Sequence, residues 1–93
     1  MLKGKFKIHE VVIASSIPKE IYLELPSILA RYSLCIWGDV SLEIKEHNDK
    51  VLKLGQGVII GSYKIDDVDI VICTSPKIRN TFILLKEDFI NSL

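Results

Sequence analysis

Apolar and β-branched residues gather in four short runs that predict strands. The first, Glu10 to Ser15, stops at two serines just before Pro18, as a strand does when it leads into a helix. Three further runs rich in Val, Ile, Phe or Leu follow in the second half of the chain, at Val58 to Ile65, Val68 to Thr74 and Thr81 to Lys86. We therefore expect one strand near the N-terminus and three near the C-terminus.

The segment between the first two strands begins with helical spacing. Pro26 cannot lie inside a helix without removing a hydrogen bond, so the pattern predicts two helices, over residues 18–24 and 26–34. Pro26 then occupies the first turn of the second helix, where it is tolerated.

A third helix is predicted from Asp39 to Leu54. Its apolar residues recur every three or four positions, and charged residues fill the opposite side. Asp39 or Ser41 could cap the start, and Gly55 could end the helix.

Asp66 and Asp67 separate two predicted strands and suit a two-residue hairpin. That register places six residues on one face, with Ile65 opposite Val68, Tyr63 opposite Ile70 and Gly61 opposite Ile72. On the other face Lys64 lies opposite Asp69, a favourable pair of charges.

These elements predict an α+β fold of the order β-α-α-α-β-β-β, with the helices packed on one face of an antiparallel sheet. The chain has 93 residues, of which 48% are hydrophobic, enough for one small core. We therefore expect residues 1–93 to form a single domain.

Composition limits the location and the partners. Twelve basic residues balance twelve acidic ones, so we do not expect direct binding to nucleic acid. Cys35 and Cys73 lie far apart among apolar neighbours and are interpreted as buried free thiols, which fits a reducing cytoplasm. The apolar run from Val11 to Ala14 is too short to span a membrane. We expect a cytoplasmic protein without membrane association.

Charged residues form two candidate sites. Asp66, Asp67 and Asp69 could coordinate a divalent cation or imitate nucleic-acid phosphate to a protein partner, although a solvated hairpin tip is the favoured interpretation. Lys77 and Arg79, in the loop before the last strand, could bind a phosphate or an acidic partner, or could belong to an ordinary polar turn.

The remaining candidates are aromatic residues and histidines. Trp37, next to Gly38 between two predicted helices, could fill the core or anchor a partner. Neither His9 nor His47 has a neighbour at the spacing of a nucleophile or metal motif. We expect no metal, no cofactor and no enzymatic activity.

Several short motifs carry a family resemblance. Leu29, Arg31 and Trp37-Gly38-Asp39 are followed at fixed spacing by Asn48-Asp49 and Leu52, and a terminal Leu84-Leu85 precedes Glu87. In these residues the chain resembles a family of small "plasmid-related" proteins carried on plasmids, integrative elements and phages. The resemblance covers most of residues 10–89 and implies an origin in a mobile genetic element.

The chain also departs from the family pattern. Tyr32 replaces the family's histidine, Cys35-Ile36 replaces Gly-Asp before the tryptophan, and Lys86 replaces the terminal proline. If the family pattern encodes an enzyme site, this chain lacks most of it, and what remains is scaffold with a few surface positions.

Three hypotheses for function follow. The first is a non-enzymatic accessory protein that inhibits a host defence complex, such as a CRISPR effector or a restriction enzyme, with Trp37 or Tyr63 as anchors and the charged residues giving specificity. The second is an RNA-cleaving toxin of the RelE/ParE type, suggested by the order of the elements. The third is a homodimeric structural module that assembles through an exposed strand.

Overall fold

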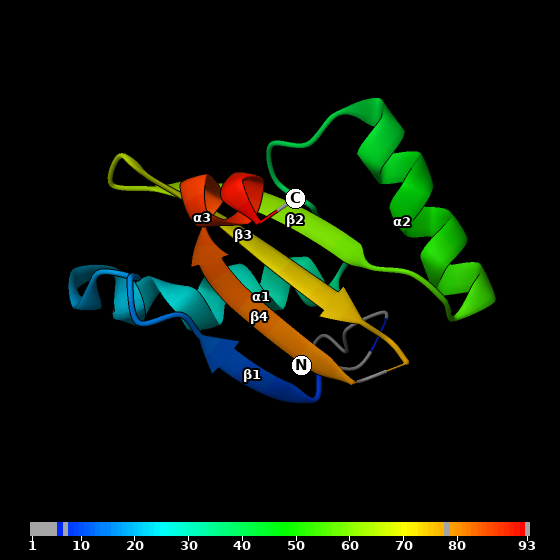
Figure 1. The fold of residues 1–93 in the computed structure, drawn as a ribbon, viewed down its shortest axis with the longest axis horizontal. Helices are drawn as coiled ribbons and strands as arrows, with labels where there is room; N and C mark the ends of the chain where they lie inside the picture. The colour runs from blue at the N-terminus through cyan, green and yellow to red at the C-terminus, as the bar shows by residue number, and fades with distance from the viewer. Residues whose placement is uncertain (1–5, 7, 78, 93) are drawn as a thin grey trace.

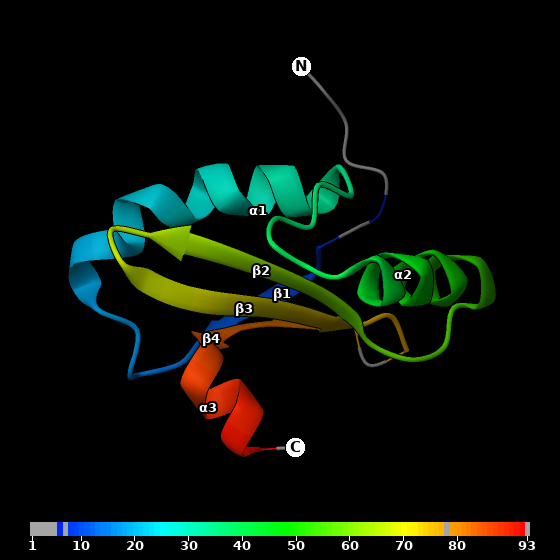
Figure 2. The same ribbon diagram turned by 90° about the horizontal axis from the view of Figure 1, so that it is seen from above.

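A single four-stranded sheet organises the chain, with helices on both of its faces (Figures 1 and 2). The computed structural model describes residues 6, 8–77 and 79–92. Its elements are β1 (Glu10–Ile13), the 3-10 helix η1 (Lys19–Glu24), α1 (Leu25–Ser33), α2 (Leu42–Leu54), β2 (Ile59–Ile65), β3 (Val68–Ser75), β4 (Asn80–Leu85) and α3 (Lys86–Asn91). The α+β class is therefore confirmed.

The sheet has the strand order β1-β4-β3-β2 and is mixed. Strands β2, β3 and β4 alternate in direction, but β1 runs parallel to β4. The expectation of an antiparallel sheet is thus wrong for β1. Because the helical connection after β1 returns the chain to the end of the sheet where β1 began, β2 runs in the same direction as β1, and so does β4.

The hairpin between β2 and β3 forms in the predicted register. Ile65 pairs with Val68, Tyr63 with Ile70, Gly61 with Ile72 and Lys64 with Asp69. Asp66 and Asp67 have φ values of 46° and 66°. Two successive positive φ angles are typical of a type I′ turn, whose twist matches that of the strands it joins.

The ends of the central helices follow their sequence signals. Pro26 lies in the first turn of α1. The Ser41 side chain accepts a hydrogen bond from the N–H of Ile44 at 3.2 Å, and Gly55 ends α2 in the left-handed conformation. Ser41, rather than Asp39, is therefore the cap.

One helix was not expected. The short α3 packs on the face of the sheet opposite α1 (Figure 2), so the prediction that all helices cover one face is wrong. The reason lies in β3, where Ile70, Val71 and Ile72 are all buried. A strand that is apolar on both sides requires cover on both.

The main core lies between the sheet and α1. Tyr32 is completely buried there, and its ring packs edge-on against Phe6 and Trp37, with ring centroids 5.3 and 5.5 Å away. The Tyr32 hydroxyl donates to Thr74 Oγ1 at 2.8 Å, and Thr74 shares a second 2.8 Å hydrogen bond with Thr81. Burial raises the pKa of Tyr32, so the phenol stays protonated and can donate.

We expect Tyr32→Phe to lower the free energy of unfolding by about 1–2 kcal/mol, because it removes a buried hydrogen-bond donor while leaving the ring. Urea denaturation measures this change. Tyr22→Phe is the matched control, since Tyr22 is 38% exposed and should tolerate the same change with little effect. Equal losses in the two variants would contradict the role given to the buried hydroxyl.

Candidate functional site

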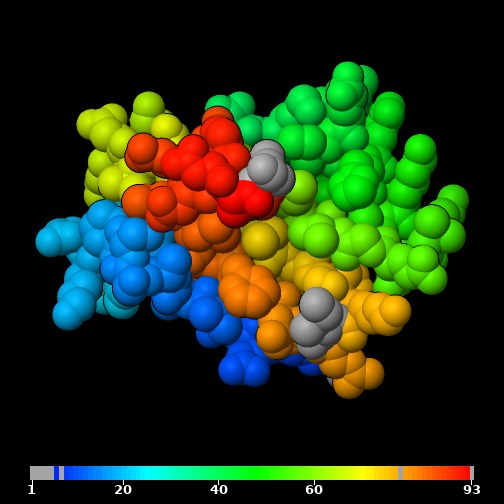
Figure 3. Space-filling view, viewed as in Figure 1, coloured from blue at the N-terminus to red at the C-terminus, as the bar shows by residue number. Residues whose placement is uncertain are grey.

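The face of the sheet that carries α3 is only partly covered (Figure 3). Beside α3, one row of apolar side chains crosses all four strands, because Val12 pairs with Phe82, Phe82 with Cys73, and Cys73 with Ile60. We call these four residues the cross-sheet strip.

The cross-sheet strip is accessible from solvent. Val12 is 40% exposed and Phe82 is 41% exposed, while Cys73 and Ile60 are half-buried. Burial raises the pKa of the Cys73 thiol, so this member of the strip stays uncharged. Contiguous exposed apolar side chains in a small protein are typical of a surface that binds another molecule.

The outer edge of β2 is covered by hydrogen bonds from the segment before α2. The carbonyl of Trp37 accepts from the N–H of Ser62 at 2.9 Å, and the N–H of Asp39 donates to the carbonyl of Ser62 at 2.7 Å. Gly38, between them, forms an isolated parallel bridge with Ser62. This segment therefore acts as a very short fifth strand.

Helix α2 continues the cover along the same edge. Asn48, which is fully buried, donates from Nδ2 to the carbonyl of Ile60 at 2.8 Å and accepts at Oδ1 from its N–H at 3.0 Å. His47 Nε2 lies 2.9 Å from the carbonyl of Val58. The outward-pointing groups of alternate residues 58, 60 and 62 thus meet partners, as a sheet edge must to avoid pairing with another chain.

The same contacts account for most of the family-like motif. Gly38 has a φ of 75°, and a Cβ atom there would lie 2.1 Å from the carbonyl oxygen of Ser62. Only glycine fits such a close backbone approach. The Trp37-Gly38-Asp39 and Asn48 positions are thus architectural, and they hold α2 and its preceding segment against the sheet.

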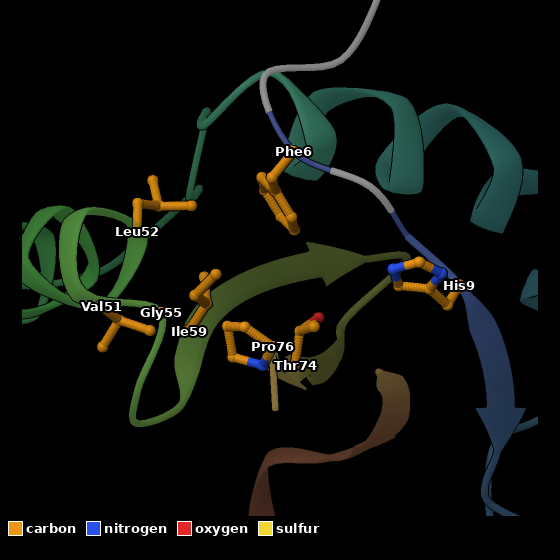
Figure 4. Close-up of a pocket in the computed structure, with 8 residues that line it drawn as sticks. All are labelled: Phe6, His9, Val51, Leu52, Gly55, Ile59, Thr74 and Pro76. Carbon is orange, nitrogen blue, oxygen red and sulfur yellow. The ribbon is translucent and has the colours of Figure 1, made fainter. Parts of the chain in front are cut away.

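A cavity of about 190 Å³ opens between α2, the sheet and the segment before β1 (Figure 4). Most of its walls are apolar, and its lining consists of Phe6, His9, Val51, Leu52, Gly55, Ile59, Thr74 and Pro76. The Thr74 hydroxyl already bonds to Tyr32 and Thr81. The volume of the cavity is close to that of cavities that hold a benzene-sized molecule. It is too small for a nucleotide cofactor.

The aromatic residues predicted as anchors lie in the core. Trp37 and Tyr63 are each only 5% exposed. The Tyr63 hydroxyl donates to the carbonyl of Ile36, and burial raises its pKa. In this conformation neither ring offers a surface on which a partner could dock.

The charged candidates lie at opposite ends of β3. Asp66 and Asp67 form the turn before the strand, and Asp69 lies one residue inside it, whereas Lys77 and Arg79 follow its other end. Eight strand residues span about 26 Å, so the structure does not bring the acidic and basic groups together. Within residues 6, 8–77 and 79–92, no three His, Cys, Asp or Glu side chains gather as metal ligands would.

Sequence reasoning missed the cross-sheet strip. The sequence places Val12 and Phe82 in strands that are apolar on both sides. Such strands are expected to be buried on both sides, so the sequence does not predict that these two residues are exposed. Their exposure depends on how far α3 extends over the sheet, and no residue near Val12 or Phe82 signals that. The continuous apolar run Phe82 to Leu85 is the signal in the sequence for a second face.

Comparisons with protein-family models, with curated proteins and with solved structures find no match to this chain. Across the part of the chain that the structure describes, none of the helices has the length and hydropathy required to traverse a bilayer.

We expect Asn48→Ala to lower the free energy of unfolding by about 3 kcal/mol, because both backbone groups of Ile60 lose their partner. Chemical denaturation followed by circular dichroism measures the loss. Asp49→Ala, at the next and exposed position of α2, should change the stability by less than about 0.5 kcal/mol. A similar loss in both variants would show that the amide does not hold the β2 edge.

Gly38→Ala should destabilise the protein by more than Gly55→Ala. Both glycines have positive φ values, 75° and 70°, so alanine costs about 1–2 kcal/mol at either position through backbone strain. A Cβ at Gly55 meets nothing within 4 Å, whereas at Gly38 it overlaps the Ser62 carbonyl. Equal shifts in the thermal midpoint of unfolding would contradict the close approach at Gly38.

Proposed function

We propose that this chain is a non-enzymatic protein-binding accessory of a mobile genetic element, and that it inhibits a host defence complex such as a CRISPR effector or a restriction enzyme. The link to mobile elements rests on the family resemblance of the Trp37-Gly38-Asp39 and Asn48-Asp49 motifs. The protein-binding role rests on the cross-sheet strip. An inhibitor of this kind acts by occupying a surface that its target needs.

The cross-sheet strip is the observation that carries the proposal. A β-sheet face with exposed Phe82 and Val12 offers a flat apolar surface, and a buried aromatic side chain is the usual energetic centre of a protein interface. Ile90 of α3, which is 54% exposed, lies on the helix beside the strip and can extend it. We assign the anchor role to Phe82, in place of Trp37 and Tyr63.

The chemistry of the strip favours a protein partner over RNA. In register with one another, Glu10, Asn80 and Ser75 form the next row across β1, β4 and β3. That row adds one negative charge and no positive charge. Lys86, which lines a pocket with Ile60 and Ile90, adds one basic side chain, whereas a surface for nucleic acid requires several Lys or Arg side chains opposite the phosphates. This scarcity of basic side chains makes the RelE/ParE-type toxin the less favoured alternative. Arrest of host growth on expression would support it.

The functional test is survival of a plasmid targeted by an active defence system in cells that express the chain. We expect wild-type protein to raise plasmid survival and Phe82→Lys to abolish most of that gain. The affinity of the Phe82→Lys variant for its target should fall by at least about tenfold, because a central aromatic contributes about 2 kcal/mol or more. Loss of the plasmid at the uninhibited rate, against every defence system of the native host, would refute the inhibitor role.

Leu23→Lys is the matched control for Phe82→Lys. Leu23 is 91% exposed on η1, away from the strip, so it receives the same change of charge at another apolar surface position. Circular dichroism should show that both variants keep the fold. If Leu23→Lys reduces inhibition as strongly as Phe82→Lys, the strip is not the binding surface.

A further inference from the structure

The two edges of the sheet differ in how they are covered. Along the β2 edge, Asn48, His47 and the Gly38 segment bind the outward-pointing backbone groups. Strand β1 forms the other edge, and Figure 1 shows no helix or strand beyond it. An edge strand without such cover can add a strand from another chain.

The unpaired groups of β1 can be assigned to particular residues. Ala14 donates its N–H to the carbonyl of Ile83 in β4 at 2.9 Å. Backbone groups point to alternate sides along a strand, so those of Val12 also face β4, whereas those of Val11 and Ile13 face outward. Within the described part of the chain, no hydrogen bond involves the outward N–H or C=O of Val11 or Ile13.

Glu10 places one charge at the start of β1, but the rest of the edge lacks the side chains that usually protect it. From Val11 to Ala14 there is no charge and no proline. Val12 is 40% exposed and Ile13 is 38% exposed, and they point to opposite faces of the sheet. An added strand must therefore offer apolar residues on both of its faces, and β1 itself does so.

We propose that two copies of this chain pair through β1, antiparallel, about a two-fold axis at Val12. In this register Val12 lies opposite Val12 of the second copy on the face with the strip, and Val11 lies opposite Ile13 on the other face. The outward groups of Val11 and Ile13 then bond to each other across the axis. In the proposed register Glu10 lies opposite the small Ala14, just beyond the end of β1, whereas centring the axis on Val11 would place the Glu10 carboxylate opposite Val12, inside the strand.

The pairing has a consequence for the cross-sheet strip. In each copy the strip runs from Ile60 through Cys73 and Phe82 to Val12, so joining the two Val12 residues makes one continuous apolar row across eight strands. The dimer does not depend on the proposed inhibition of a defence complex, because its test is the oligomeric state alone.

Sedimentation equilibrium of the complete chain tests the proposal. We expect a mass twice the 10.5 kDa of one chain at protein concentrations up to about 100 μM, where an interface of micromolar affinity is saturated. A mass of one chain at the highest concentration would overturn the proposal and would leave a strand of another protein as the occupant of the edge.

Two lysine variants test the position of the interface. Val12→Lys places two ammonium groups opposite each other at the axis, and we expect it to shift the mass to that of one chain. Val58→Lys is the matched control, because Val58 has the same residue type and the same 40% exposure but lies beside the β2 edge. A dimer that survives Val12→Lys, or that dissociates equally with Val58→Lys, would overturn the pairing through β1.

A cysteine variant tests the register. Val12→Cys brings two thiols together at a non-hydrogen-bonded antiparallel pair, where the backbones are close enough for a disulfide. We expect mild oxidation to join two chains through residue 12, as identified by mass spectrometry of the peptides. Ile13→Cys should not link to itself in this register, and a 13–13 link formed in preference to a 12–12 link would overturn it.

Discussion

The paired hydrogen bonds between Asn48 and Ile60 are the constraint on which the rest of the structure depends. One amide group donates and accepts at the same backbone position, as a neighbouring strand would, and it does so from a fully buried site. Losing either bond would leave a backbone group of β2 without a partner in a poorly hydrated place. Helix α2 packs few buried side chains, so its position relative to the sheet depends on this polar contact.

The two edges of the sheet differ in how far they are open to pairing with another chain. Asn48 and the Gly38 segment cover the β2 edge at Ile60 and Ser62, whereas β1, on the opposite side, has no comparable cover within the described residues. The apolar strip begins at that same open edge, at Val12. The role of Gly38 and Asn48 in the structure is therefore to cover part of one side of the sheet, while the other side stays accessible.

How much of the fold the sequence predicts depends on how local the determining interactions are. The β2–β3 hairpin follows from alternation and from two turn residues, and its register is confirmed pair by pair. The caps of α2 are equally local. The direction of β1 is not, because it depends on pairing with Thr81 to Ile83, some seventy positions away. Helix α3, with six residues, is too short to show helical periodicity.

The candidate site was harder to predict than the fold, for a physical reason. Trp37 and Tyr63 were conspicuous as large aromatics, but large aromatics bury the most surface and are therefore used first to fill a small core. Phe82 has the same chemistry and remains exposed only because α3, about 9 Å long, covers part of strands that extend about 20 Å or more. A helix with another turn or two could cover more of the strip. The short α3 thus leaves the strip as an uncovered apolar surface, at a cost in stability that association with another surface would offset.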